Sequence, residues 1–406
     1  MSGIAILRDV ETKGKTVLLR LDLNSPIDPG SSRILDDKRF QEHLPTLEAL
    51  KESKVVVLAH QSRPGKKDFT SLQAHAEKLE NLLGRSVQFV DDIIGTCARD
   101  AVRAMRIGEV VMLENVRLNA EENLTLKPED ATKTLLIRRL SRMGDLFVND
   151  AFGTAHRSQP TIVGLPLAIH SFAGLLMERE VTQLSRIFSG APQPVCFILG
   201  GTKVDDSLDV ARHVLAKNIA DRVIMIGVVA NVFLIARGYA IGNPSIQLIE
   251  QLGYTDLVEG ARELLERYPD RILLPTSIAV KEKNGRVEYS VNNIPCDAPV
   301  LDIGKEAIAE ISRCLAEAGT VVFNGPAGVF EEKAFALGTQ EILKAASKVP
   351  FSVVGGGHTA AVIERMGIKK DFTHISIGGG ACIEFLTGKK LPALDALERS
   401  KQIFGL

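Results

Sequence analysis

The first half of the chain carries polar and basic residues directly after short apolar runs. The segment RLDLNSP (residues 20–26) alternates polar and apolar residues at the end of one such run. Because side chains of a strand point alternately to its two faces, Arg20, Asp22 and Asn24 share one face. The same half also holds Arg39, His60, Gln61, Ser62, Arg63, Arg117, His156 and Arg157. Guanidinium groups match carboxylate and phosphate oxygens, so this set favours a small, strongly anionic ligand.

Two simpler interpretations of these residues stay open at this point. RLDLNSP could be an edge strand with one solvent-exposed face, and each arginine could be a solvated loop residue. The convergence of several arginines and histidines on one sheet edge favours a binding site instead. A metal site built from histidines is less favoured, because no histidine has an i, i+4 partner of the zinc-protease type.

The second half of the chain carries glycine clusters between predicted strands and helices. The clusters are Gly200–Gly201, Gly325–Gly328, Gly355–Gly357 and Gly378–Gly380. Glycine lets backbone N–H groups approach an anion, and the start of a helix adds a positive dipole. A single cluster could equally be a tight turn that binds nothing. Two triplets together with Gly200–Gly201 favour a site for nucleotide phosphates.

The elements that must position these residues are read from hydrophobic patterning. Continuous apolar runs such as 55–58, 195–199 and 351–354 alternate with helical patterns such as 40–52 and 305–318. This alternation predicts an α/β fold with parallel sheets covered on both faces. Open α/β sheets bind ligands at the carboxyl ends of their strands. The basic first half and the glycine-rich second half therefore predict two sites of different character, one on each domain.

Composition narrows the functional classes. The 406 residues carry a net charge of −1, with 5% aromatic residues and no Trp, so we expect neither nucleic-acid nor membrane binding. The longest apolar run, 223–236, is interrupted by Gly227 and Asn231 and is too short for a membrane span. Five cysteines without a CxxC motif, and an N-terminus without a secretory signal, predict a reducing, cytoplasmic setting.

Other protein classes fit the sequence less well. A dehydrogenase or another small-molecule kinase is the enzymatic alternative, but the chain lacks both the dinucleotide fingerprint GxGxxG and a complete P-loop. A two-domain binding protein of the periplasmic type is the non-enzymatic alternative. The missing signal sequence argues against it, and the glycine triplets would have no role there.

Taken together, the motifs resemble phosphoglycerate kinase along nearly the whole chain. The matching segments are RLDLNSP (20–26), DDKRF (36–40), HQSRP (60–64), LENVR (113–117), VNDAFGTAHR (148–157), LGGTKV (199–204), FNGPAGVFE (323–331), GGGHTAA (355–361) and HISIGGGACIEFLTGKKLP (374–392). GGTKVDDS and GGGH are closer to the archaeal branch of that family.

The resemblance implies two Rossmann-like domains with parallel sheets, joined by an interdomain helix, with the active site in the cleft. We expect an N-terminal domain over residues 1–170 and a C-terminal domain over residues 171–392. Residues 171–188 would form the interdomain helix, and 393–406 would return to the N-terminal domain. A monomer is the expected state, with a homodimer as the alternative.

The resemblance also assigns roles to individual residues. The 3-phosphoglycerate or 1,3-bisphosphoglycerate ligand would be held by Asp22, Leu23, Asn24, Arg39, His60, Gln61, Ser62, Arg63, Arg117 and Arg157. ADP or ATP, bound with Mg²⁺, would be held by Gly200, Gly201, Lys203, Asn324, Glu331, Gly355, Gly356, Gly357, His358 and Thr359. The expected catalytic groups are Arg39, Lys203 and the backbone at Gly357 and Gly380. The implied reaction is reversible phosphoryl transfer between 1,3-bisphosphoglycerate and ADP, giving 3-phosphoglycerate and ATP, as in glycolysis and gluconeogenesis.

Four positions depart from the pattern that the family implies. His358 stands where most members have an aspartate near the metal, and Ser207 stands where many have a second lysine. Ile377 replaces a threonine before the last glycine triplet, and Ala327 replaces a methionine. The protein ligands of the metal therefore stay open, while the substrate arginines are unaffected.

Overall fold

Two six-stranded parallel sheets organise the chain. The structure, a computed structural model, describes residues 3–283, 285–295 and 297–405, and these divide into two compact units. Unit 1 holds the described residues up to Thr182 and those from Lys390 onward, and unit 2 holds Gln183–Lys389. The predicted α/β class with parallel sheets is confirmed.

The division falls inside helix α8 (Leu175–Phe188) rather than near residue 170. The first turn of α8 is tied to unit 1, because the backbone N–H groups of Leu176 and Met177 donate to Asp150 Oδ1 over 2.9 and 3.2 Å. The N–H of Leu175 donates to Thr46 Oγ1 over 3.1 Å. These hydrogen bonds satisfy donors that a helix start leaves free, and they anchor the helix to the sheet of unit 1.

The sheet of unit 1 has the strand order β3-β4-β2-β1-β5-β6, and every neighbouring pair is parallel. The strands are β1 (Thr16–Arg20), β2 (Lys54–Leu58), β3 (Val87–Val90), β4 (Val110–Leu113), β5 (Leu146–Asn149) and β6 (Ser171–Ala173). The connecting helices are α1 (Lys38–Ala49), α2 (Gln73–Leu83), α3 (Thr96–Ala104), α4 (Pro128–Ala131), α5 (Leu135–Leu140), α6 (Pro160–Val163) and α7 (Leu165–Ala168). The carboxyl ends of β1, β2, β4 and β5 consequently meet at one edge of the sheet.

Both faces of this sheet are buried, as the continuous apolar strands require. Alternate residues of β1 enter different core clusters. Val17 and Leu19 pack with Phe40 of α1, whereas Leu18 packs with Phe147 on the other side. All of these side chains are fully buried.

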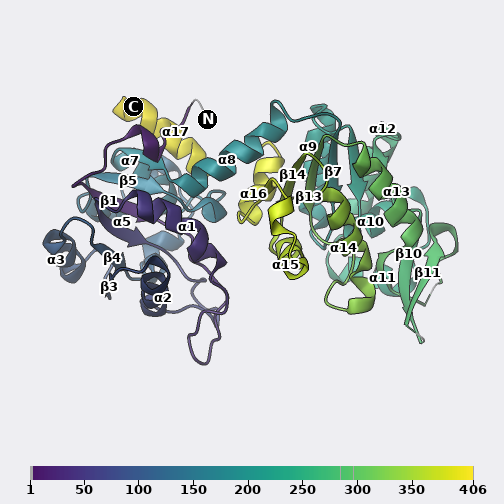
Figure 1. Cartoon of the computed structure of the whole chain (residues 1–406), viewed down its shortest axis with the longest axis horizontal. Coiled ribbons are helices and arrows are strands. Elements are labelled where there is room, and N and C mark those ends of the chain that lie inside the picture. The colour runs from purple at the N-terminus through teal and green to yellow at the C-terminus, as the bar shows by residue number, and fades with distance from the viewer. Residues whose placement is uncertain (1–2, 284, 296, 406) are drawn as a thin grey trace. The chain divides into compact units, whose positions relative to one another are not determined.

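The last helix, α17 (Pro392–Phe404), belongs to unit 1 and packs against α6 and α7 (Figure 1). The N–H of Ala393 donates to the carbonyl of Ala155 over 2.9 Å. The ring of Phe404 lies 4.5 Å from that of His170. The C-terminal segment thus completes the same unit in which the chain begins.

Unit 2 has a six-stranded parallel sheet in the order β15-β14-β13-β7-β8-β9. Its strands are β7 (Val195–Leu199), β8 (Arg222–Met225), β9 (Ile272–Leu273), β13 (Thr320–Asn324), β14 (Phe351–Gly355) and β15 (His374–Ile375). Its helices are α9 (Val204–Ala216), α10 (Gly227–Arg237), α11 (Asn243–Gln251), α12 (Leu257–Arg267), α13 (Lys305–Ala316), α14 (Leu337–Ala346), α15 (Gly357–Met366) and α16 (Gly380–Leu386). A second, antiparallel sheet of β10 (Ser277–Glu282), β11 (Gly285–Ser290) and β12 (Val300–Ile303) was not expected from the sequence.

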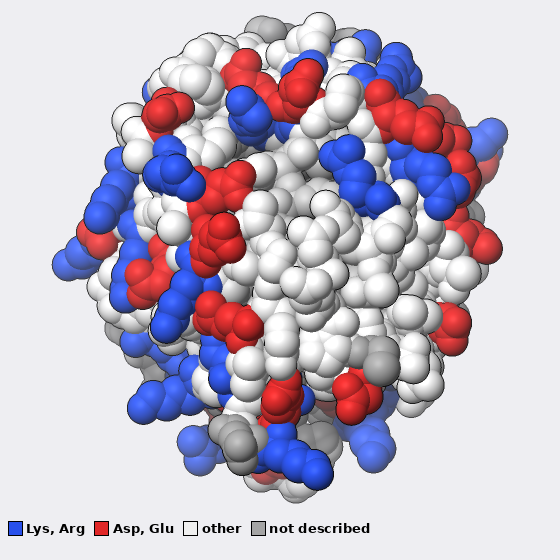
Figure 2. All heavy atoms as spheres, turned by 90° about the vertical axis from the view of Figure 1, so that its right-hand side faces the viewer, with Lys and Arg blue, Asp and Glu red and all other residues white. Residues whose placement is uncertain are grey.

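The surface of unit 2 that faces the viewer in Figure 2 mixes acidic and basic side chains around an uncharged area. No single sign of charge dominates this face. In the part of the chain that the structure describes, no helix is both long and apolar enough to cross a membrane.

Two strand-to-helix loops of unit 2 touch each other through glycines. Gly325 follows β13 with a φ of +84°, and a Cβ there would lie 2.2 Å from the carbonyl oxygen of Gly200. The N–H of Gly200 also donates to Asn324 O over 2.8 Å. Neither backbone can move aside without breaking this contact, so the crossing requires glycine at position 325.

We predict that Gly325→Ala lowers the free energy of unfolding by about 2–4 kcal/mol. Positive φ costs a non-glycine residue about 1–2 kcal/mol, and overpacking adds about 1–3 kcal/mol. Urea unfolding measures the change. Gly238→Ala is the matched control, because Gly238 has a φ of +95° but nothing within 4 Å of an added Cβ. Equal losses in the two variants would show that the contact between the loops contributes nothing.

Candidate functional site

In unit 1, the loops that follow β1, β2 and β4 are hydrogen-bonded to one another at the carboxyl edge of the sheet. Asn24 Oδ1, after β1, accepts the N–H of Ser62, after β2, over 2.8 Å. Arg117, after β4, donates from Nη1 to the carbonyl of Ser62. Three segments that are far apart in sequence are therefore held as one surface, and Asn24, Ser62 and Arg117 lie together on it.

Asp22 and Arg39 form an ion pair on this surface. Asp22 is 3% exposed, whereas Arg39, near the start of α1, keeps 31% of its side chain exposed. Burial alone would raise the pKa of Asp22, but Arg39 and the further basic neighbours outweigh burial and hold that pKa well below its usual range. Gly153 allows this approach, because a Cβ there would lie 2.1 Å from Asp22 Oδ2. Asp22 thus stays ionised and fixes the Arg39 guanidinium near the strand ends.

Arg20 sets the protonation of His60. Its Nη2 lies 3.2 Å from His60 Nδ1, and since a guanidinium only donates, Nδ1 must accept. Burial, followed by the positive charge of Arg20, lowers the pKa of His60 well below its ordinary value. His60 is therefore neutral at pH 7 and carries its proton on Nε2. In this tautomer Nε2–H can donate to an anion.

Arginine side chains crowd this surface with few carboxylates to balance them. Arg117 is 3% exposed, and its Nη2 is buried without a hydrogen-bond partner among the described residues. Burial, and then the charge of Arg157, lower the pKa of Arg117 to about 10, so it remains charged at pH 7. Burial also lowers the pKa of Arg157, which feels the charges of Arg63 and Arg39. A buried, unpaired donor among like charges is the signature of a site for an anion.

Two of the predicted substrate residues turn their side chains elsewhere. Leu23 is fully buried in the hydrophobic core of unit 1. Gln61 is also fully buried, where its carboxamide pairs with the backbone of Ser25 over 3.2 and 3.1 Å. Only the backbone of these residues can face a ligand. The structure adds His43, which accepts the N–H of Asp22 over 3.1 Å and lies 2.8 Å from Asp150 Oδ2.

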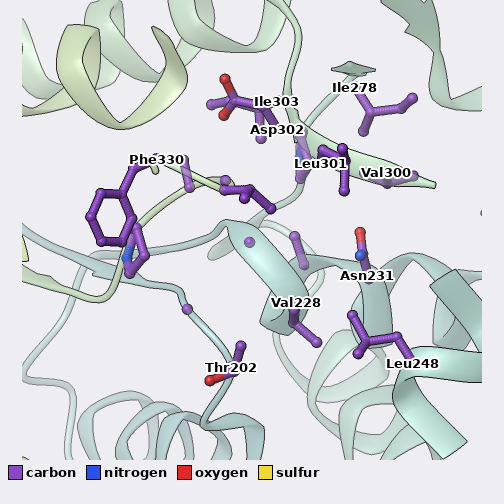
Figure 3. A pocket seen from close by; sticks show the side chains of 18 of the residues that line it. Thr202, Val228, Asn231, Leu248, Ile278, Val300, Leu301, Asp302, Ile303 and Phe330 are labelled. Carbon is purple, nitrogen blue, oxygen red and sulfur yellow. The ribbon is translucent and has the colours of Figure 1, made fainter. Parts of the chain in front are cut away.

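Unit 2 contains a cavity of about 200 Å³ at the ends of β7, β8 and β13 (Figure 3). Its walls come from loops and from α10, α11, β10 and β12. The apolar part of the lining comprises Val228, Leu248, Ile278, Val300, Leu301 and Ile303. Asn231 extends its carboxamide between Leu248 and Val300, while Thr202 and Phe330 lie at the other side of the view (Figure 3). An apolar slot with a few polar groups suits a flat heterocycle.

Glycine loops lead from this cavity to two helix starts. Gly356, with a φ of +89°, precedes α15, and Gly379, with a φ of +53°, precedes α16. Asn324 Oδ1 and Thr359 Oγ1 are buried without hydrogen-bond partners among the described residues. A Cβ on Gly356 would lie 3.3 Å from the former and 3.7 Å from the latter. Unpartnered polar atoms beside the start of a ten-residue helix suit a polar, anionic ligand.

The predicted nucleotide residues are distributed unevenly around the cavity. Gly201, Glu331 and His358 line it, and the ring of His358 lies 5.7 Å from that of Phe330. Lys203 lies outside the lining, with its exposed Nζ 3.6 Å from Asp206 Oδ2. Asn324 and Gly355 are the last residues of β13 and β14. Loops and helix starts contain Gly200, Gly356, Gly357, Thr359 and Gly380.

The structure shows the surroundings of two residues that depart from the family pattern, Ser207 and Ala327. Ser207 is buried in α9, and its hydroxyl donates to the carbonyl of Lys203, one turn earlier, over 2.9 Å, so its side chain is bonded within its own helix. Ala327 lines the cavity. Sequence reasoning missed Asn231 and the wall formed by β10 and β12. The only sequence signal for Asn231 was that it interrupts the apolar run 223–236.

An anion site at one parallel sheet and a heterocycle pocket with glycine-lined helix starts at another define a small-molecule phosphotransferase. Residues 7–389 match the phosphoglycerate kinase family. The chain is 63% identical to a phosphoglycerate kinase from Methanocorpusculum labreanum, with 98% of each chain covered. It is 47% identical to phosphoglycerate kinase 2 from Methanosarcina acetivorans, covering 96% of this chain and 94% of that one.

The fold agrees with these relationships. The crystal structure of phosphoglycerate kinase from Pyrococcus horikoshii OT3 superimposes with a TM-score of 0.92 at 41% identity, covering 98% of this chain and 100% of that one. The chain belongs to the phosphoglycerate kinase family. Its activity is therefore phosphoryl transfer to and from the carboxyl group of 3-phosphoglycerate (EC 2.7.2.3), as the sequence predicts.

A buried histidine beneath the unit 1 site makes stability depend on pH. His75, in α2, is fully buried, and its Nε2 lies 3.1 Å from Gln61 Oε1. Burial lowers its pKa to about 4. The unfolded chain takes up this proton near pH 6.5, but the folded chain does so only near pH 4. Between these values the unfolded state binds more protons, so stability falls as the pH falls.

We predict that His75→Gln loses about 2 kcal/mol less stability than the wild type when the pH falls from 7 to 5. Glutamine keeps a donor for Gln61 but does not titrate. Urea unfolding at both pH values gives the comparison. His170→Gln, at an exposed position, is the control for loss of a histidine from the surface. An acid loss as large in His75→Gln as in the wild type would show that His75 does not cause it.

Proposed function

We propose that unit 1 binds 3-phosphoglycerate or 1,3-bisphosphoglycerate through its anion site. The groups that would hold the ligand are Asp22, Asn24, Arg39, His60, Arg63, Arg117 and Arg157, with the backbone of Leu23, Gln61 and Ser62. The single observation that carries this proposal is the unpartnered, buried Nη2 of Arg117 among other guanidinium groups. A ligand with a phosphate at one end and a carboxyl group at the other would satisfy several such donors at once.

We propose that unit 2 binds ADP or ATP. The base and ribose would occupy the 200 Å³ cavity, where Glu331 can accept hydrogen bonds from ribose hydroxyls. The phosphates would lie at the loops of Gly200 and Gly201 and at the helix starts marked by Gly357 and Gly380. There, backbone N–H groups and the helix dipole favour negative charge. The unpartnered side-chain oxygens of Asn324 and Thr359 would accept hydrogen bonds from water or from protonated groups beside the phosphates.

Mg²⁺ would arrive with the nucleotide. In the described ranges, no three His, Cys, Asp or Glu side chains are grouped so that they could hold a metal ion. Mg²⁺ prefers oxygen ligands and commonly keeps several waters while bound by phosphates. The orphan Asn324 Oδ1 and Thr359 Oγ1 are oxygens suited to such a hydrated ion. His358, at the second position of α15, would donate to a phosphate rather than bind the metal.

Catalysis would rest on positioning and on charge. The carboxylate of 3-phosphoglycerate is already ionised at pH 7, so it needs no general base to attack the terminal phosphate. Arg39 and Lys203 would stabilise the negative charge of the transferring group. Asp22 and Asp206 hold these two cations when the ligands are absent. Because the two ligands would bind to different units, transfer requires the units to bring them together.

The cellular location and the oligomeric state of the enzyme are also proposals. None of the described residues Cys97, Cys196, Cys314 and Cys382 forms a disulfide, which supports a reducing, cytoplasmic location. We expect a monomer, and light scattering distinguishes it from a homodimer. A coupled assay of ATP-dependent 3-phosphoglycerate use tests the complete proposal. Folded protein that gives no turnover above a control without enzyme would refute it.

We predict that Arg39→Ala lowers kcat by at least about 10²-fold, since removal of a guanidinium from a transferring phosphoryl group costs about 10³–10⁵ in rate. The Kd for ADP should stay unchanged, because Arg39 lies in unit 1 and the cavity in unit 2. Steady-state kinetics and calorimetry measure the two quantities. Arg33→Ala removes an exposed arginine from the preceding loop and serves as the control. A normal kcat in Arg39→Ala would mean that Arg39 does not reach the reacting group.

We predict that Asn231→Leu weakens ADP binding by about 10-fold. Leucine keeps the volume of this 4% exposed side chain but removes the one carboxamide that faces the base in the apolar slot, a loss of about 1–2 kcal/mol. Calorimetry with ADP measures the effect, and titration with pyrophosphate, which has no base, provides the matched control. Unchanged ADP affinity, or an equal loss for pyrophosphate, would place the base elsewhere.

A further inference from the structure

Two cysteine thiols of unit 2 meet between the parallel sheet and α13. Cys196 lies on the central strand β7, and Cys314 lies in the last turn of α13. Their Sγ atoms are 3.8 Å apart although the residues are separated by 118 positions. Cys196 is 1% exposed, whereas Cys314 is partly exposed. One thiol is thus reachable from solvent and the other is held directly behind it.

The neighbours of the two thiols make them unequal. The hydrogen bond with Cys196 lowers the pKa of Cys314 although burial opposes this, and the same bond, together with burial, raises the pKa of Cys196. Arg222 pairs in register with Cys196 on the adjacent strand, and its positive charge favours a thiolate at either sulfur. Glu310 of α13 and Glu317, which follows that helix, oppose this at Cys314, and Asp221 opposes it at Cys196. Arg222 therefore favours ionisation of this thiol pair, and Cys314 is its more exposed member.

We propose that Cys196 and Cys314 form an oxidation site at which a hydroperoxide converts the two thiols into a reversible disulfide. The arrangement has the parts that thiol-based peroxide sensors need: an accessible nucleophilic thiolate and a resolving thiol next to it. Neither cysteine lines the cavity of unit 2. The site is therefore distinct from the proposed nucleotide site.

The chemistry proceeds in two balanced steps. The thiolate of Cys314 attacks one oxygen of hydrogen peroxide, the O–O bond breaks, and hydroxide leaves. Cys314 then carries a sulfenic acid, and its sulfur has lost two electrons to the peroxide. The thiol of Cys196 attacks this sulfur, the S–S bond forms, and the hydroxyl group leaves as water with the thiol's proton. In total, two thiols and one peroxide give one disulfide and two waters.

The geometry favours this pair over the other two cysteines that the structure describes. Cys97 is exposed in unit 1, and Cys382 is buried in α16. The sulfur atoms of Cys196 and Cys314 need to approach by less than the width of one atom to reach the S–S bond length of about 2 Å. Cys196 belongs to the core that Cys314 packs against, so a disulfide would join α13 to β7 within that core.

The test uses the full chain, reduced and then treated with about one equivalent of hydrogen peroxide at pH 7. Free thiols are blocked with N-ethylmaleimide before mass spectrometry without reduction. We expect the oxidised chain to carry two N-ethylmaleimide groups fewer than the reduced chain and a Cys196–Cys314 peptide to appear, and dithiothreitol added before blocking should reverse both changes. Calorimetry should show the same ADP affinity before and after oxidation.

Three variants separate this proposal from general thiol oxidation. Cys314→Ser should form no disulfide, and Cys97→Ser, the matched control, should behave as the wild type. Cys196→Ser should leave Cys314 as a sulfenic acid that dimedone traps, and circular dichroism confirms its fold. Oxidation of Cys97 ahead of Cys314, or a disulfide that persists in Cys314→Ser, would overturn the proposal.

Discussion

The organisation of unit 1 depends on holding several buried guanidinium groups together at one sheet edge, where the carboxyl groups of Asp22 and Glu122 interact with them. Arg20, Arg117 and Arg157 all have lowered pKa values because burial penalises their charge. The folded chain tolerates them through Asp22, which stays ionised, and through backbone carbonyls such as that of Ser62. Much of the donor capacity is nevertheless left over. An anion bound at this surface, as proposed, would accept hydrogen bonds from these donors and offset their mutual repulsion.

The other residues at this edge support that arrangement. Gln61 and His75 fix the loop after β2, and Asn24 joins it to the loop after β1. His43 connects the backbone of Asp22 to Asp150, whose other oxygen caps the start of α8. The charged surface is thus built on buried hydrogen bonds, not on flexible loops. Such support keeps like charges in place when no ligand is present.

Unit 2 handles negative charge in a different way. Its loops place glycine backbone and two helix starts where phosphates would bind, and the exposed Lys203 is paired with Asp206. Close backbone crossings, such as that of Gly325 with Gly200, leave no room for side chains. The proposed division of work follows from this contrast. Arginine side chains of unit 1 would bind the small substrate, and backbone N–H groups of unit 2 would bind the phosphates of the nucleotide.

Much of this could be predicted from the sequence, because parallel strands between two helix layers are continuously apolar and their carboxyl ends share one edge. The alternation of such runs indicated both sheets, and the residues that follow them indicated both sites. The antiparallel sheet β10–β12 escaped prediction, since Val300–Ile303 is short and the hairpin around Gly285 is half exposed. Asn231 was read as a break in an apolar run, because only the fold shows that α10 faces a cavity. The partners of Arg39 and Lys203 depend on side-chain packing, which spacing does not encode.

The central claim is that the arginine surface of unit 1 is destabilising until an anion binds. It is tested most directly by urea unfolding of Arg117→Met with and without 3-phosphoglycerate. Methionine fills the space but removes a buried charge with an unpartnered donor. The account predicts that the ligand-free variant is at least as stable as the wild type, and that 3-phosphoglycerate no longer stabilises it. A variant that is clearly less stable without ligand, yet still stabilised by 3-phosphoglycerate, would contradict the account.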